Sequence, residues 1–242
     1  MRSSGRTLRD GYERMSNLNK LTTPVDRGNR GVQRRTHHSF SGAEVEVFFD
    51  GLEEKIVELI DQSDAVVGCV AWLTSKPILE ALSKKPCQIV VQKEDFLRPD
   101  KNATKTQIRQ RYDALRGFIK YSLVDCLVST LNIASEERMD AVRCAGEFST
   151  SQKGLSPRNH NKFMVFLRRI NDDYAEALQA EKVWTGSYNH SFTATQSFEN
   201  CVLFHDQRVA KAYLDEWAHI YSLSEELDWE NTWVEPQFRI GS

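Results

Sequence analysis

The stretch AVVGCVAWLTSKPILEALSKKPCQIVVQK, residues 65–93, decides the fold class of this chain. It opens with an unbroken run of small, β-branched and other apolar residues, a pattern that is typical of a strand covered on both faces. Ser75 and Pro77 then provide the cap and the first-turn residue of a helix. A second buried strand is expected at 87–93. A buried strand, a helix and another buried strand predict a parallel βαβ unit.

The flanking segments continue the alternation of strands and helices. Upstream, residues 45–49 predict a short strand, and the apolar residues of 52–60 recur at helical spacing. Downstream, residues 108–115 predict a charged helix, and residues 206–222 place their large apolar side chains on one helical face. Together these elements predict an α/β fold.

Charge divides the chain into two parts. The net charge is −2, yet residues 1–40 hold nine of the 32 Lys and Arg residues and three of the 34 Asp and Glu residues. We therefore predict a basic, flexible arm at 1–42 and one folded domain at 43–242. The arm is expected either to neutralise nucleic-acid phosphates or to be a solvated tail. A mitochondrial transit peptide is disfavoured by Asp10 and Glu13.

Cysteine usage and hydropathy narrow the class of protein. The cysteines are widely spaced and lie mostly in apolar segments, so reduced core thiols are expected. They are Cys69, Cys87, Cys126, Cys144 and Cys201. No CxxC pair and no zinc-ligand spacing occurs, so no structural metal is expected. No apolar run approaches the roughly 20 residues that span a bilayer, so we expect a soluble, cytoplasmic protein without stable membrane insertion.

Two segments combine polar residues with apolar, strand-like runs. They are RNHNKFMVFL at 158–167 and VWTGSYNHSFTATQSFENCVLF at 183–204. Both segments have strand character, and side chains two residues apart on a strand project from the same face. If the two strands pair, polar groups from both converge at one place. The expected cluster comprises His160, Lys162, Ser187 and Asn189.

Burying a lysine ammonium or an imidazole costs free energy unless a charged or hydrogen-bonding partner is present. An anionic substrate would be such a partner and would explain the cluster. Glu199 is expected to accept a hydrogen bond from the His160 imidazole and to fix its tautomer. Arg158 and Lys153 precede the first segment in a polar loop, where they either line a phosphate cleft or are simply solvated. Asn200, beside Glu199, is placed with the substrate-binding residues.

The order of three short motifs resembles a known family. HNK at 160–162, GSYN at 186–189 and SFEN at 197–200 are similar to the HxKxxxxD, GSxN and SEN motifs of the phospholipase D superfamily, most closely its single-motif bacterial endonucleases. The resemblance extends more weakly over 45–222. It implies a phospholipase D-like fold, with a mixed, mostly parallel sheet flanked by helices on both faces.

The resemblance also implies a mechanism without metal or cofactor. His160 would attack phosphorus to form a phosphohistidine, a second histidine would protonate the leaving oxygen, and water would then release the product. Lys162 and Asn189 would hold the nonbridging oxygens, which is the work of magnesium in many other phosphoryl-transfer sites. Because the chain has one HxK motif, the second histidine is expected from a homodimer with a shared site.

One departure from the family pattern concerns its aspartate, whose position is occupied by Leu167. Asp172 and Asp173 are candidates for its supporting role, although nothing in the sequence indicates that either takes it. The preferred interpretation is a metal-independent nuclease that acts on DNA or RNA. Two alternatives remain open: a phospholipid hydrolase acting on cardiolipin or phosphatidylcholine, and a catalytically weak nucleic-acid-binding relative.

Overall fold

The computed structural model describes residues 40–41, 44–94, 97, 103–117, 131–132, 140–148, 157–172, 175–228, 231 and 239–240. Most of the predicted arm, together with Lys153 and Cys126, lies outside these residues. Phe40 and Ser41, which fall inside the predicted arm, form a strand that pairs with the first strand of the domain.

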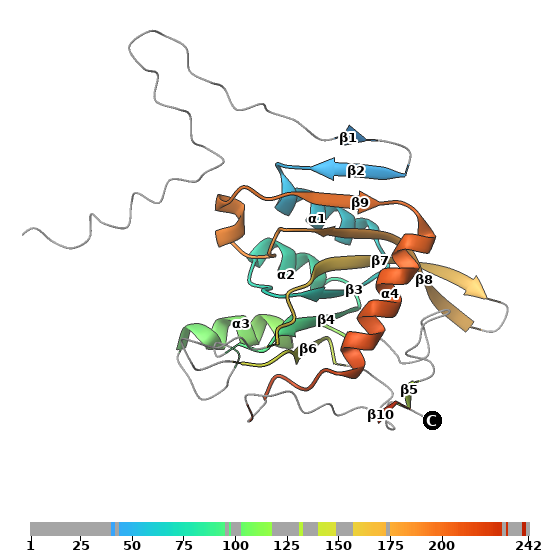
Figure 1. The fold of residues 1–242 in the computed structure, drawn as a ribbon. Coiled ribbons are helices and arrows are strands. Elements are labelled where there is room, and N and C mark those ends of the chain that lie inside the picture. Colours follow the sequence, from blue (N-terminus) through green and yellow to red (C-terminus); the bar gives the residue numbers. More distant parts are fainter. Residues whose placement is uncertain are drawn as a thin grey trace, which may run out of the picture.

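An eight-stranded sheet runs through the described structure (Figure 1). In chain order its strands are β1 (Phe40–Ser41), β2 (Val45–Phe48), β3 (Ala65–Val70), β4 (Cys87–Gln92), β6 (Val142–Ala145), β7 (Lys162–Asp172), β8 (Ala175–Gly186) and β9 (Cys201–Phe204). Across the sheet the order is β1-β2-β9-β8-β7-β3-β4-β6. A separate pair is formed by β5 (Leu131–Asn132) and β10 (Arg239–Ile240).

The sheet is mixed, as predicted, but the expectation of a mostly parallel sheet is wrong. Within the described sheet β3 pairs in parallel with β4 and β4 with β6, while the other five pairings are antiparallel. The parallel part arises from the predicted βαβ unit, in which a helix carries the chain back before β4 starts. The antiparallel part arises from β7 and β8, which follow each other along the chain and pair directly.

Helices cover both faces of this sheet, as predicted. They are α1 (Leu52–Gln62), α2 (Lys76–Leu82), α3 (Ala103–Asp113) and α4 (Gln207–Ser222), with a short 3-10 helix, η4, at Thr193–Gln196. α1 and α2 lie behind the sheet in Figure 1, and α4 crosses its front. The start of α2 follows the sequence prediction, because the Ser75 hydroxyl accepts a hydrogen bond from the Ile78 amide at 3.3 Å.

Strand β7 separates two apolar layers by the alternation of its side chains. Met164 and Phe166 pack into the layer that contains α1 and α2. Val165 and Leu167 pack into the layer beneath α4, together with Trp217. All five are at most 1% exposed, so β7 is held on both faces and its amino-terminal end has a defined position.

Candidate active site

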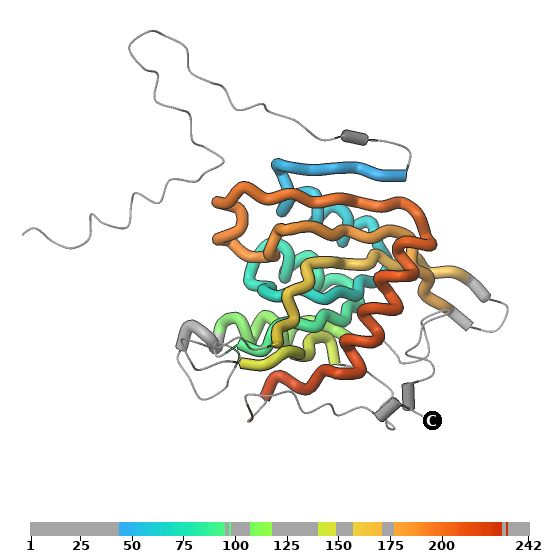
Figure 2. The backbone as a smooth tube through the Cα atoms, viewed as in Figure 1, coloured from blue at the N-terminus to red at the C-terminus, as the bar shows by residue number. Residues whose placement is uncertain are grey.

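Several chain segments with polar residues meet at one end of the sheet. β7 begins, β8 ends and β9 begins at this end, because these three strands run antiparallel to one another. The parallel strands β3 and β4 also finish there, since β3 is antiparallel to β7. The smooth tube in Figure 2 shows the chain rising into the start of β7 beside these strand ends. In α/β sheets, the carboxyl ends of parallel strands are a common place for ligands.

His160 and Lys162 lie at the start of β7. His160 is exposed, whereas Lys162 is 9% exposed. The Lys162 Nζ atom lies 3.3 Å from both ring nitrogens of His160 and donates a hydrogen bond to the His160 carbonyl at 2.9 Å. Burial lowers the pKa of Lys162, while the negative charge of Glu199 acts in the opposite direction. A partly desolvated cation is therefore held directly beside an accessible imidazole.

Ser187 directly follows β8, and Glu199 lies two residues before β9, the strand that pairs with β8. The Ser187 hydroxyl donates a hydrogen bond to the Glu199 carboxylate, and it accepts one from the Asn200 amide at 3.1 Å. The Asn200 side chain donates to the same hydroxyl at 3.4 Å. The predicted hydrogen bond from His160 to Glu199 is not formed, because β8 separates β7 from β9 and the carboxylate binds the nearer hydroxyl.

Gly186 makes this close approach of β8 and β9 possible. A Cβ atom at this position would lie 2.1 Å from the Asn200 carbonyl oxygen and 2.7 Å from the Cys201 Cα atom. Both neighbours are backbone atoms, which cannot move aside without shifting a strand. The glycine of the GSYN motif therefore allows the Ser187 amide to donate to the Asn200 carbonyl at 2.9 Å.

Asn189 and His190 complete the cluster, and His190 was not among the site residues expected from the sequence. The Oδ1 atom of Asn189 and both ring nitrogens of His190 are buried without a hydrogen-bond partner among the described residues. Burial, and then the positive charge of Lys162, lowers the pKa of His190 to about 3. His190 is thus a neutral imidazole near Lys162. The available signal was its position directly after the GSYN motif.

Arg158 lies at the rim of the site, beside a surface hollow. Asn159, Asn161 and Gly146 also line this hollow. The Asn159 backbone amide donates to the Gln92 side-chain oxygen at 2.7 Å, and its side chain donates to the Val90 carbonyl at 3.2 Å. Asn159 is therefore an anchor that fixes the loop before His160, while Arg158 is exposed to solvent.

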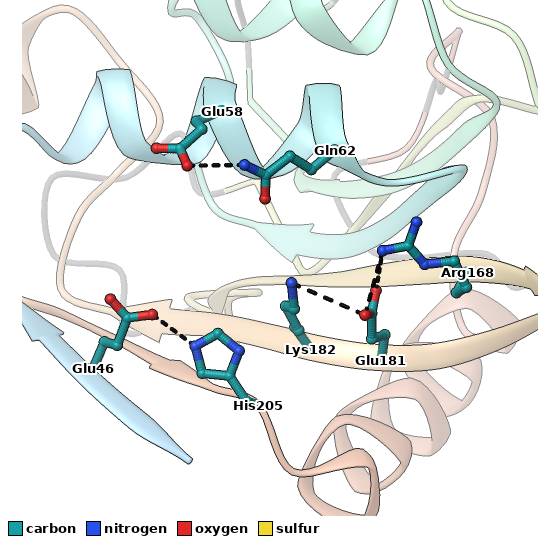
Figure 3. Close-up of polar contacts among 7 residues, drawn as sticks. All are labelled: Glu46, Glu58, Gln62, Arg168, Glu181, Lys182 and His205. Atoms are coloured by element: carbon teal, nitrogen blue, oxygen red, sulfur yellow. Dashed lines mark hydrogen bonds and ion pairs between the residues drawn. The ribbon is translucent and has the colours of Figure 1, made fainter. Parts of the chain in front are cut away.

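Leu167 and Asp172 lie away from the site, and so does His205. Leu167 is five residues along β7 from Lys162, or about 16 Å at the rise of a strand. Asp172, considered as a substitute for the missing aspartate, is farther still, at the last position of β7; Asp173 lies outside the described residues. The His205 ring points toward Glu46 in Figure 3, and its Nε2 atom lies 2.7 Å from the Glu46 carboxylate. His205 follows β9, at the opposite end of this strand from Glu199.

Two further findings concern metals and membranes. Within the described residues, no group of three or more His, Cys, Asp and Glu side chains is arranged to hold a metal ion. In the same part of the chain, none of the helices has the length and apolar character needed to cross a membrane.

Comparison with known proteins places the chain in a family. It is 30% identical over 211 residues to the uncharacterized protein L381 of Acanthamoeba polyphaga mimivirus, and the match covers 81% of this chain and 71% of L381. This chain belongs to the L381 family. No family model matches its sequence.

Solved structures with a similar path of the chain include two bacterial proteins. This L381-family chain is similar to NucT from Helicobacter pylori, with a TM-score of 0.49 and 12% identity over 76% of this chain and 98% of NucT. It is also similar to Nuc from Salmonella typhimurium, a phospholipase D family member, with a TM-score of 0.44 and 15% identity over 75% of this chain and 95% of Nuc. At sequence identities of 12% and 15%, the similarity concerns the backbone fold and says nothing about the activity of this chain.

Proposed function

We propose that this chain is a metal-independent phosphodiesterase of the phospholipase D superfamily that cleaves nucleic acids. The observation that carries the proposal is the Lys162 ammonium, which lies within 3.3 Å of both ring nitrogens of an exposed histidine at the ends of the strands. An imidazole with a cation beside it suits attack on an anionic phosphorus centre, because the cation neutralises charge on the phosphoryl oxygens as the new bond forms.

The chemical roles follow from the positions of the side chains. A ring nitrogen of His160 forms a bond to phosphorus, and the bond from phosphorus to the leaving oxygen breaks. Lys162 donates to the His160 carbonyl and contacts both ring nitrogens, and when a phosphate binds, its N–H groups would turn from the ring to the nonbridging oxygens. Water then attacks the phosphohistidine and restores the free imidazole. The Ser187 hydroxyl, held by Glu199, lines the same end of the sheet.

A second histidine is needed to protonate the leaving oxygen, and we propose that it is His160 of a second copy of the chain. His190 lies near Lys162 but is poorly suited to this role, since its lowered pKa of about 3 leaves it without a proton to give at neutral pH. An exposed His160 at one end of the sheet is accessible to a partner molecule. A twofold axis through the site would supply both histidines to one phosphate.

Loss of the family's aspartate does not weaken this proposal. Leu167 is fully buried in the apolar layer beneath α4, about 16 Å along the strand from Lys162. A carboxylate at that position would not reach a phosphate held by His160. This favours an active enzyme over the catalytically weak binding protein.

Cleavage assays in EDTA test the proposal. Purified protein is incubated with labelled single-stranded DNA, duplex DNA, RNA, and vesicles of phosphatidylcholine and cardiolipin. We expect polynucleotide cleavage in EDTA that falls by about 1,000-fold or more in His160→Ala. His205→Ala, which removes a histidine at the other end of β9, is the matched control and should retain activity.

Four results would each contradict one part of the proposal. Loss of wild-type cleavage in EDTA would refute metal independence, and full activity in His160→Ala would refute the nucleophile. Cleavage of vesicles in preference to polynucleotides would favour the phospholipid hydrolase. A strictly monomeric active species in light scattering would refute the shared site.

A further inference from the structure

Four large aromatic residues are exposed in segments that adjoin the candidate site. They are Phe49 at 40%, Trp72 at 45%, Phe192 at 72% and Phe198 at 59% exposure. Among the described residues, the exposed large apolar side chains comprise these four and Leu223. Single exposed apolar residues are common on protein surfaces, whereas a group of them around one site indicates a binding surface. We call these four residues the aromatic rim.

The strand order places the rim on both sides of the catalytic residues. Phe49 directly follows β2, and Phe198 directly precedes Glu199 at the start of β9. Trp72 comes two residues after β3. In the sheet, β8 and β7 lie between β9 and β3, so the rim flanks the two strands whose ends carry His160 and Asn189. Neighbouring strands are about 4.8 Å apart, so Trp72 follows the strand next to β7, whereas Phe198 precedes a strand about 10 Å from β7.

Trp72 is firmly positioned beside the site. Its neighbour Ala71 donates a backbone hydrogen bond to the Asn161 carbonyl at 2.8 Å, and Leu73 forms a bridge with His190. The indole nitrogen donates to Glu94 at 3.3 Å. Trp72 therefore lies between the segment that carries His160 and the segment that carries Asn189, with its ring tethered by one edge and still substantially exposed.

Three glutamates lie near the aromatic rim in the chain, so the rim is not a cluster of basic residues. Glu94 is hydrogen bonded to Trp72, Glu199 follows Phe198, and Glu53 lies in the first turn of α1 close to Phe49. Duplex nucleic acids and anionic membranes are both bound mainly by clusters of Lys and Arg, whereas single strands combine phosphate contacts with stacking of their bases on aromatic rings. A rim that combines aromatic rings with carboxylates is better suited to flat, uncharged faces than to many phosphates. Unpaired bases present such faces.

We propose that the aromatic rim stacks unpaired bases on either side of the scissile phosphate, so that single-stranded nucleic acid is the preferred substrate. This inference rests on the proposed phosphodiesterase function and adds its substrate class. In a duplex the bases are stacked on one another and do not reach the rim. A single strand laid across the strand ends brings one phosphate to His160 and presents its flanking bases to Trp72 and Phe198.

The experiment measures kcat/KM of Trp72→Ala and Phe198→Ala on three substrates of one sequence. These are a single-stranded oligonucleotide, its duplex, and a single strand with abasic residues flanking the cleavage site. For each variant we expect a loss of at least about fivefold on the single strand, the lower end of base stacking, and little change on the other two. Trp72→Phe should retain most of the activity. His205→Ala, which removes a side chain at the other end of β9, is the control.

The outcomes separate this inference from the proposed function. Equal loss on all three substrates would overturn the stacking role, and so would unchanged activity in both alanine variants. A shift of either variant from dimer to monomer in light scattering would assign the rim to a protein interface instead. Failure of the wild type to cleave any polynucleotide would refute the proposed function itself. Wild-type preference for duplex substrate would refute the inference alone.

Discussion

An aspartate at position 167, where the motif that this sequence resembles has one, should damage this protein rather than improve it. In Leu167→Asp, a side chain that is 0% exposed and packed beneath α4 is replaced by a carboxyl group. Loss of the buried leucine costs about 2–3 kcal/mol. Full burial raises the pKa of a carboxyl by up to 3–5 units, and at pH 7 the cost is limited by protonation to about 4 kcal/mol. The expected total, about 6 kcal/mol, is comparable with the whole stability of a typical domain.

The pH dependence of this variant distinguishes a buried charge from lost packing. Because the folded-state pKa of the new carboxyl is raised, its destabilising effect is absent below the unfolded pKa of about 3.9, grows with pH up to the folded pKa, and is constant above it. Leu167→Asn loses similar packing without a titratable group, so its deficit should not depend on pH. Urea unfolding of both variants and the wild type at matched pH values measures the difference. A Leu167→Asp protein that is as stable as wild type and more active would show that this residue faces the site.

Three further predictions concern the site itself. Gly186→Ala should destabilise the protein by about 1–3 kcal/mol in thermal unfolding, because its Cβ would overlap the Asn200 carbonyl. Gly51→Ala is the control: its Cβ would meet nothing closer than 4.0 Å, so only the positive φ at this position should destabilise it. Activity should fall as the pH rises through the lowered pKa of Lys162, since the cation is lost, and Lys162→Arg should move that alkaline limb to higher pH. Glu199→Gln should move the limb to lower pH, because the carboxylate raises the pKa of Lys162, and an unchanged pH profile would refute this coupling.

Local patterns in the sequence were sufficient to predict several elements. The buried runs at 65–70 and 87–92 form the parallel strands β3 and β4, and Ser75 caps the helix between them. These predictions succeeded because burial on both faces and helix capping depend on residues close together in the chain. The strands that follow HNK and precede GSYN do pair as β7 and β8, which was the condition for the expected convergence of their polar groups.

Long-range arrangement required the tertiary structure. The proportion of antiparallel pairing depends on where β2 and β9 join the sheet, and no local pattern specifies which distant strands meet. Glu199 was expected to bind His160, but the intervening strand β8 places Ser187 nearer to its carboxylate. The sequence alone thus determined which residue types are available for chemistry. Only the folded sheet decided their neighbours, because hydrogen-bond partners are set by strand order and by distances of a few ångströms.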